Sequence, residues 1–219
     1  MSLSDNESHQ TSPYVLNIRQ QPQRARVGSD SRSVQPSVIL QLHLKQESKI
    51  SGDDLESANF GVFALLGSAD LPSREITYYG ERDDAITHLL RGDTVASQLW
   101  CPEDLDPANP PPPVEVAGLP TPVFFVFNYL TIHQFGEYRL IFRLFQPPTL
   151  PTKGASIRIL ASITSWVFPV VKPSNFSGVI AKTELERRLE NAGARGRGRR
   201  TIEGAARRQK ADDPKSRIS

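Results

Sequence analysis

The densest run of apolar and aromatic residues lies just past the middle of the chain and divides into two strand-like halves. Residues 123–130 are rich in the β-branched and aromatic side chains that pack well on a pleated sheet. Residues 138–145 alternate between apolar positions and positions that include Arg139 and Arg143, which is typical of a strand with one dry and one partly wet face. Because Gly136 suits a turn between them, the pattern predicts a hairpin at the centre of a β domain.

Similar alternation recurs along most of the chain. It predicts strands over residues 14–20, 38–44, 60–66 and 95–100, and one or two strands over 156–171. The pattern is weaker at 76–79, where we expect a short strand, and at 85–90, where we expect a short helix or strand. Many short strands separated by turns rich in proline and glycine predict an all-β sandwich.

The period changes near the C-terminal end, where one short helix is expected. Thr183 suits an N-cap, and Glu186, three residues later, completes a capping-box pattern. Leu185 and Leu189 lie on one stripe of this helix, and Gly193 suits its C-terminal cap. A helix this short is only marginally stable in isolation. We therefore expect its two leucines to dock on the sheet or to face a partner subunit.

Composition divides the chain into three parts. A length of 219 residues allows one domain with tails. Residues 1–12 are polar and bury almost nothing, and residues 193–219 combine glycine with charge, which opposes folding. We therefore expect a disordered N-terminal tail over 1–12, a β-sandwich domain over 13–192 and a basic disordered tail over 193–219.

The net charge of +2 hides an uneven distribution. Residues 1–181 hold 14 Lys and Arg against 18 Asp and Glu, a charge of −4, and residues 182–219 hold 12 against 6, a charge of +6. A basic tail on a mildly acidic body indicates a polyanion partner or an import signal. Two basic clusters in the tail resemble a bipartite nuclear import signal, which predicts a nuclear location: Arg199, Arg200, Arg207, Arg208 and Lys210.

A long basic loop is expected between the first two strands. It carries Arg24, Arg26 and Arg32 within nine residues, together with Gly28. One interpretation is a solvated loop whose arginines have no function, because surface arginines are common. The other is a phosphate-contacting loop, because guanidinium groups on a flexible backbone can reach successive phosphates.

Four consecutive prolines, Pro110 to Pro113, favour a polyproline II segment ahead of the central strands. This segment is either a stiff surface spacer or a docking site for a proline-binding protein.

The sequence contains no catalytic motif. It has no glycine-rich phosphate cradle and no zinc spacing, and its four histidines lack local Cys or carboxylate partners: His9, His43, His88 and His133. Cys101, the only cysteine, is followed by Pro102, Glu103 and Asp104, which disfavour a thiolate. No apolar run is long enough to span a membrane. We therefore expect no enzyme activity, catalytic residue, metal, cofactor, membrane contact or small-molecule substrate.

Several motifs, in order, resemble the velvet domain of fungal developmental regulators. The opening YVLNIRQQPQRAR at 14–26 is similar to the start of that domain, and VILQL at 38–42 stands where the family has its next strand. FFVF at 124–127 and GEYRLIFRLF at 136–145 resemble the family's central strands. With the closing helix, the resemblance covers residues 13–192.

The resemblance implies an immunoglobulin-like β-sandwich akin to the Rel-homology domain of the NF-κB type. It also implies a nuclear protein that binds double-stranded DNA as a homodimer or as a heterodimer with another velvet-type protein. Such proteins regulate fungal development, sporulation and secondary metabolism. By motif position, the DNA-facing role falls on three arginines: Arg24, Arg26 and Arg32.

The basic loop departs from the family pattern. The family's lysine ahead of the basic stretch is missing, its cysteine is Val27, one arginine of a pair is Ser31, and the loop is shorter. These differences remove positive charge. They support a second hypothesis, in which the chain is an interaction subunit that pairs with another velvet-type regulator and contributes little to DNA contact.

Overall fold

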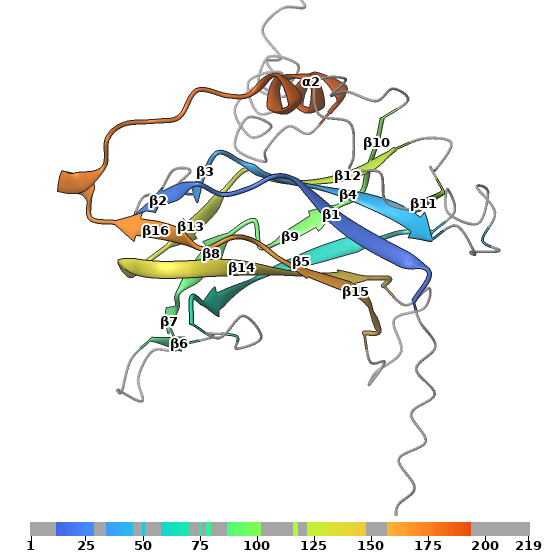
Figure 1. The fold of residues 1–219 in the computed structure, drawn as a ribbon, viewed down its shortest axis with the longest axis horizontal. Coiled ribbons are helices and arrows are strands. Elements are labelled where there is room, and N and C mark those ends of the chain that lie inside the picture. Colours follow the sequence, from blue (N-terminus) through green and yellow to red (C-terminus); the bar gives the residue numbers. More distant parts are fainter. Residues whose placement is uncertain are drawn as a thin grey trace, which may run out of the picture.

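The structure is a computed structural model that describes residues 12–28, 34–45, 50, 58–70, 75, 78–79, 87–101, 116–117, 122–147 and 157–193. These residues form two facing β-sheets with a short C-terminal helix on the outside of one of them (Figure 1). The predicted all-β sandwich with a C-terminal helix is therefore confirmed.

The first sheet has the strand order β1–β4–β12–β10, and β11 also pairs with β4. Every pair in it is antiparallel. Its strands are β1 (Tyr14–Gln20), β4 (Val38–Lys45), β10 (Leu99–Trp100), β11 (Val116–Ala117) and β12 (Val123–Phe127).

The second sheet has the order β3–β2–β16–β14–β5–β9, with β15 also on β14. Its pairs are antiparallel except for β16 with β2, which run parallel. The strands are β2 (Arg24–Arg26), β3 (Val34–Gln35), β5 (Gly61–Ser68), β9 (Val95–Ser97), β14 (Gly136–Phe145), β15 (Ile159–Thr164) and β16 (Phe168–Val171).

The remaining elements are small. Strand β8 (Leu90–Gly92) pairs with β13 (Leu130–Ile132), and β6 (Tyr78–Tyr79) pairs with β7 (Thr87–His88). A 3-10 turn, η1 (Pro173–Asn175), precedes helix α2 (Glu184–Ala192).

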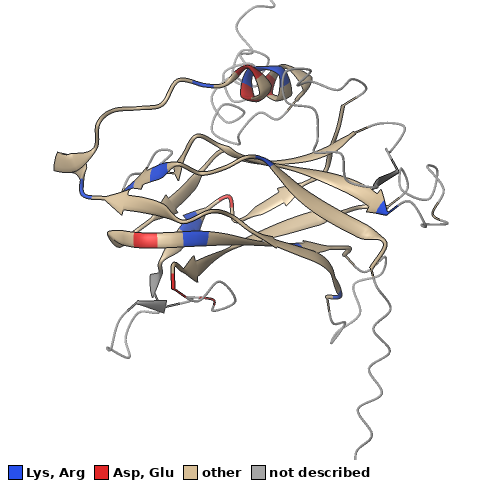
Figure 2. Ribbon diagram, in the orientation of Figure 1, with Lys and Arg blue, Asp and Glu red and all other residues tan. Residues whose placement is uncertain are grey.

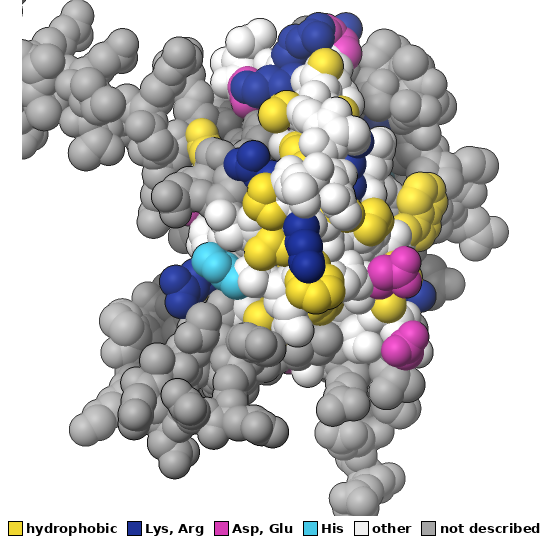
Figure 3. Space-filling model, turned by 90° about the vertical axis from the view of Figure 1, so that its left-hand side faces the viewer, with side chains coloured by type: hydrophobic (Ala, Val, Ile, Leu, Met, Phe, Trp, Pro, Cys, Tyr) yellow, Lys and Arg dark blue, Asp and Glu magenta, His cyan; other side chains and the backbone are white. Residues whose placement is uncertain are grey.

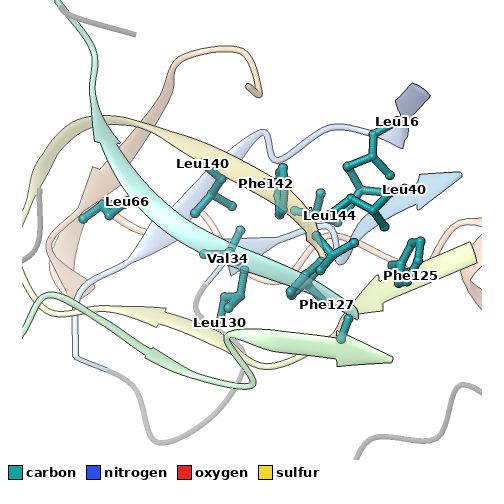
Figure 4. Close-up of a cluster of buried hydrophobic side chains, with 14 of the residues drawn as sticks. Leu16, Val34, Leu40, Leu66, Phe125, Phe127, Leu130, Leu140, Phe142 and Leu144 are labelled. Atoms are coloured by element: carbon teal, nitrogen blue, oxygen red, sulfur yellow. The ribbon is translucent and has the colours of Figure 1, made fainter. Parts of the chain in front are cut away.

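The core lies between the two sheets and is built from their inward-facing apolar side chains (Figure 4). Phe127 of β12 and Phe142 of β14 meet there with ring centroids 5.2 Å apart. Both rings are almost fully buried, and burying a phenylalanine side chain contributes about 1.5–3 kcal/mol. This contact joins the inner faces of the two sheets.

The predicted central hairpin is wrong. Strand β12 pairs with β4 and β10, and β14 pairs with β5, β15 and β16, so the two strands lie in opposite sheets. The strand ends at Phe127, and Asn128 and Tyr129 belong to no strand. Leu130, the last residue of the predicted strand, begins β13. The aromatic run therefore supplies both walls of the core. Period-two alternation shows which side chains face inward but not which strand is the neighbour.

Residues 95–100, predicted as one strand, divide in the same way. Val95–Ser97 is β9 in the second sheet and Leu99–Trp100 is β10 in the first, with Gln98 between them. The Gln98 side chain accepts a 2.8 Å hydrogen bond from the backbone N–H of Phe60, which holds this crossing point in place. The long strands agree closely with the alternation: β1, β4, β5 and β14 each lie within two residues of their predicted positions.

Helix α2 docks on the outer face of the first sheet. Leu185 and Leu189 are buried in a cluster with Ile39, Cys101 and Phe124. The prediction that they face a partner subunit is therefore wrong, and the alternative, docking on the sheet, is confirmed. The reason is that Ile39 of β4 and Phe124 of β12 point to the outside of the first sheet, and the two leucines cover this apolar patch.

The predicted caps of α2 are present. Thr183 Oγ1 accepts a 3.2 Å hydrogen bond from the N–H of Glu186, and the N–H of Gly193 donates to Glu190 O at 3.3 Å. The tails predicted to be disordered, 1–12 and 193–219, lie outside the described residues except for Ser12 and Gly193. Their disorder therefore stays a prediction.

Candidate nucleic-acid interface

One end of the sandwich brings the basic N-terminal segment against the end of β16 and the end of β13. Arg26 pairs in parallel register with Val171, and the N–H of Val27 donates to Val171 O at 3.0 Å. Val27 also forms a bridge with Ile132, and the N–H of Gly28 donates to Ile132 O at 3.2 Å. Three segments distant in sequence therefore meet at this end, which lies on the left of Figure 1.

The arginines of the predicted basic loop are only partly in a loop. Arg24 and Arg26 belong to β2, which is held between β3 and β16. The prediction of one long loop between the first two strands is therefore wrong at residues 24–26. A strand of three residues with one apolar residue, Ala25, has too little alternation to be recognised in the sequence. Arg32 lies outside the described residues.

Arg24 is held by the segment that follows η1. Its guanidinium donates hydrogen bonds to Ser177 Oγ and, at 3.0 Å, to Gly178 O. The guanidinium carbon also lies 5.3 Å from the centroid of the Phe176 ring. Through these contacts Arg24 connects β2 to the segment that leads to α2. Part of its hydrogen-bonding capacity is already used within the chain.

Arg26 shares the same aromatic ring. Its guanidinium carbon lies 5.7 Å from the Phe176 centroid, within the range of a cation–π contact. The side chain is half-buried, so the stem is supported by the protein. Two guanidinium groups on successive outward positions of β2 are thus ordered on one ring.

A second cation and ring lie beside this pair. Lys172 follows β16 directly, and its Nζ lies 4.8 Å from the centroid of Phe135. Phe135 is 58% exposed and precedes Gly136, the first residue of β14. Gly136 has a φ of 151°, and a Cβ there would meet the Tyr138 ring at 3.1 Å, so this turn requires glycine.

We call this set the basic end: Arg24, Arg26, Phe135, Lys172 and Phe176. Segments 24–28, 132–136 and 168–178 contain three Lys and Arg and no Asp or Glu. Figure 2 shows Lys and Arg on β2 and just beyond β16, whereas α2 carries both signs. Viewed from this end, basic and hydrophobic side chains lie beside one another on the surface (Figure 3). The nearest carboxylate along β14, Glu137, is exposed.

The first turn of α2 carries a buried carboxylate, Glu186, that is hydrogen-bonded to the first sheet. The sequence did not predict these contacts. Glu186 is 1% exposed and accepts hydrogen bonds from Ser37 Oγ at 2.5 Å and from Gln20 Nε2 at 3.4 Å. Thr183 Oγ1 donates to Gln20 Oε1 at 2.5 Å. We call these four residues the buried polar cluster. The capping-box pattern had indicated a role for Glu186 only within its own helix.

His43 is a buried side chain on β4. Burial, and secondly the positive charge of Arg19, lower the pKa of His43 below its ordinary value of 6.5. Arg19 donates a hydrogen bond to Gln41 Oε1 on the same strand as His43. Neutral His43 therefore contributes to the packing of the first sheet.

Catalytic chemistry finds no support among the described residues. Cys101 is buried, and burial raises the pKa of its thiol, which disfavours a nucleophilic thiolate. No group of three or more His, Cys, Asp or Glu in the described part of the chain is placed to hold a metal ion. Among the same residues, no helix is long and apolar enough to cross a membrane.

Two further sequence predictions cannot be compared with the structure. The proline segment 110–113 lies outside the described residues. So do the basic residues proposed as an import signal: Arg199, Arg200, Arg207, Arg208 and Lys210.

Comparison with known proteins gives consistent matches. The Velvet factor family matches two overlapping segments, residues 14–98 and 78–203. The chain is 30% identical over 210 residues to a sexual development regulator of Mycosarcoma maydis, covering 87% of this chain and 47% of that protein. It is 28% identical over 226 residues to a developmental and secondary metabolism regulator of Dothistroma septosporum, covering 93% and 33%.

A spore development regulator of Pyricularia oryzae is 32% identical over 190 residues, which cover 83% of this chain and 32% of that protein. The chain thus spans about a third to about a half of the length of these relatives. All three are named as regulators. The family match extends over most of the chain and over both sheets, so the chain belongs to the velvet factor family.

Proposed function

We propose that this protein is a nuclear transcription regulator that binds double-stranded DNA through the basic end, as a homodimer or as a heterodimer with another velvet-type protein. Its relatives are named as regulators of sexual development, spore development and secondary metabolism. These names support a role in fungal development, sporulation and secondary metabolism.

The observation that carries the proposal is the convergence of three cations, against one adjoining carboxylate, Glu137, at one end of the sandwich. Arg26 is ordered on Phe176, and Lys172 lies at the end of the neighbouring strand β16. Ordered guanidinium and ammonium groups lose little side-chain entropy when they meet phosphate oxygens. Loops and strand ends of β-sandwiches provide such surfaces repeatedly.

We propose a direct phosphate contact for Arg26 and a positioning role for Arg24. Arg24 already donates to Ser177 and Gly178, so its first effect is to hold the segment that carries Phe176. Arg32 remains a proposed phosphate contact from the resemblance alone.

The test is the salt dependence of binding to a random-sequence DNA duplex. Each phosphate contact adds about 0.9 unit to the slope of log affinity against log salt concentration. We expect Arg26→Gln to lower that slope by about 0.9 unit. The matched control is Arg158→Gln, an exposed arginine just ahead of β15. Equal slopes for both variants and the unmodified protein would remove the basic end as the DNA surface.

The interaction-subunit hypothesis has one observation in its favour, which is that Arg24 is engaged within the chain. Gel-shift measurements of the protein alone and mixed with a second velvet-type protein separate the two functions. A shift by the protein alone supports direct binding. A shift only in the mixture, unchanged by Arg26→Gln, supports the interaction subunit.

A further inference from the structure

The turn between β13 and β14 carries an aromatic side chain at a position where no core contact explains it. Phe135 is 58% exposed, although residues on either side of it in sequence, Ile132 and Tyr138, are buried. Single exposed apolar residues are common and carry no function by themselves. Here the ring has a defined neighbour, because the ammonium group of Lys172 lies 4.8 Å from its centroid.

This pair is joined by backbone to the segment that carries Arg26. Lys172 follows Val171, which pairs in register with Arg26, and Phe135 lies three residues after Ile132, which accepts the hydrogen bond from Gly28. Residues at 26, 135 and 172 therefore project from adjacent strand ends of one rigid unit. A polyanion that approaches Arg26 meets Lys172 and Phe135 in the same approach.

We propose that Phe135 and Lys172 form a second DNA-contacting element, in which the ammonium group pairs with a phosphate and the phenylalanine ring packs against a sugar or base edge in the adjoining groove. This inference rests on the proposed function and adds to it a contact that does not depend on the basic loop. Apolar side chains make such contacts with base edges, thymine methyl groups included. The cation beside the ring provides the phosphate contact that fixes its position.

The choice of DNA over a protein partner follows from charge. The three segments at this end carry three Lys and Arg against one adjoining carboxylate, Glu137, so the net charge around the ring is positive. A protein-binding hot spot of the same size would bury an apolar cluster, whereas the ring at this turn is already covered on one side by a cation.

The experiment measures duplex DNA affinity over a series of salt concentrations for two variants. Lys172→Gln should lower the salt slope by about 0.9 unit, because one phosphate contact is lost. Phe135→Ala should weaken binding about fivefold or more at every salt concentration and leave the slope unchanged, because the lost contact is apolar. Circular dichroism and thermal unfolding establish that both variants are folded.

Matched controls come from positions outside the basic end. Trp166→Ala removes a ring that is 71% exposed in the connection before β16, and Arg158→Gln removes an exposed cation ahead of β15. Ile159 pairs with Phe145 at the end of β14 opposite to Gly136, which places Arg158 far from Phe135. Neither control should change affinity or slope.

The outcomes separate this inference from the proposed function. If Arg26→Gln lowers the slope while Lys172→Gln and Phe135→Ala match the controls, the second element is wrong and the first stands. If none of the three variants differs from the controls, both are wrong. If Phe135→Ala leaves DNA binding unchanged but abolishes self-association measured by sedimentation, the ring contacts a second copy of the chain and the inference is overturned.

Discussion

The C-terminal segment is tied to the N-terminal strands at two places, and the two ties differ in their contact with water. In the buried polar cluster, Glu186 is 1% exposed and its carboxylate is paired with Ser37 and Gln20. At the basic end, Arg24 holds Ser177 and Gly178 in an exposed position, and Phe135, the ring beside Lys172, is 58% exposed. Both ties join residues about 150 positions apart in the chain.

The difference indicates what each tie contributes. A buried carboxylate must find its partners inside the protein, so the polar cluster specifies the position of α2 on the first sheet. An exposed set of cations gains little stability from internal contacts but remains able to exchange water for phosphate. Variants at the first tie should therefore change folding, and variants at the second should change binding.

The largest expected effect is on the helix that closes the polar cluster. Leu189→Ala should lower the free energy of unfolding by about 2–5 kcal/mol, because Leu189 is fully buried against the outer face of the first sheet. Urea unfolding followed by circular dichroism measures this change. A loss below about 0.5 kcal/mol, typical of exposed positions, would contradict the docking of α2.

A smaller loss is expected from the buried carboxylate. Glu186→Ala should lower the free energy of unfolding by about 1–3 kcal/mol, because the Ser37 hydroxyl and the Gln20 amide lose their acceptor in a dry site. The control is Glu190→Ala on the same helix, whose ion pair with Lys182 is partly exposed and contributes at most about 1 kcal/mol. Equal losses for the two variants would mean that the cluster is accessible to water.

The buried region should also respond to pH through His43. Its pKa is lowered in the folded protein, so the unfolded chain binds a proton first as the pH falls through 6.5. The stability provided by neutral His43 is complete above that pH and declines below it, by less than about 1.4 kcal/mol per pH unit. Urea midpoints at pH 7.5 and pH 5.5, compared with those of His43→Gln, measure this contribution. A His43→Gln variant with the same pH dependence would assign it to other groups.

The sequence predicted the inward faces of the strands better than their partners. Alternation in β1, β4 and β14 placed these strands because each directs alternate apolar side chains toward the core, Leu16, Leu40 and Phe142 among them. The same alternation failed to show that β12 and β14 belong to opposite sheets, since a break at Asn128 and Tyr129 does not disturb the aromatic composition of the run. Partner choice depends on long-range pairing, which local periodicity does not contain.

The candidate site was predicted in part. The density of arginines pointed to Arg24 and Arg26, but not to their place in a short strand or to the ring of Phe176 between them. Lys172 and Phe135 were missed because they lie far along the chain and reach the site through strand pairing. The one local signal was an aromatic residue next to glycine in a predicted turn, an unusual place for a core side chain.

The most direct test of the DNA surface is to follow backbone amide signals of the ¹⁵N-labelled protein by NMR while a random-sequence duplex is added at low salt. We predict that the largest changes occur at Val27, Gly28, Phe135, Gly136 and Lys172, with little change at β15 and α2. Changes confined to β15, α2 or the outer face of the first sheet would contradict it.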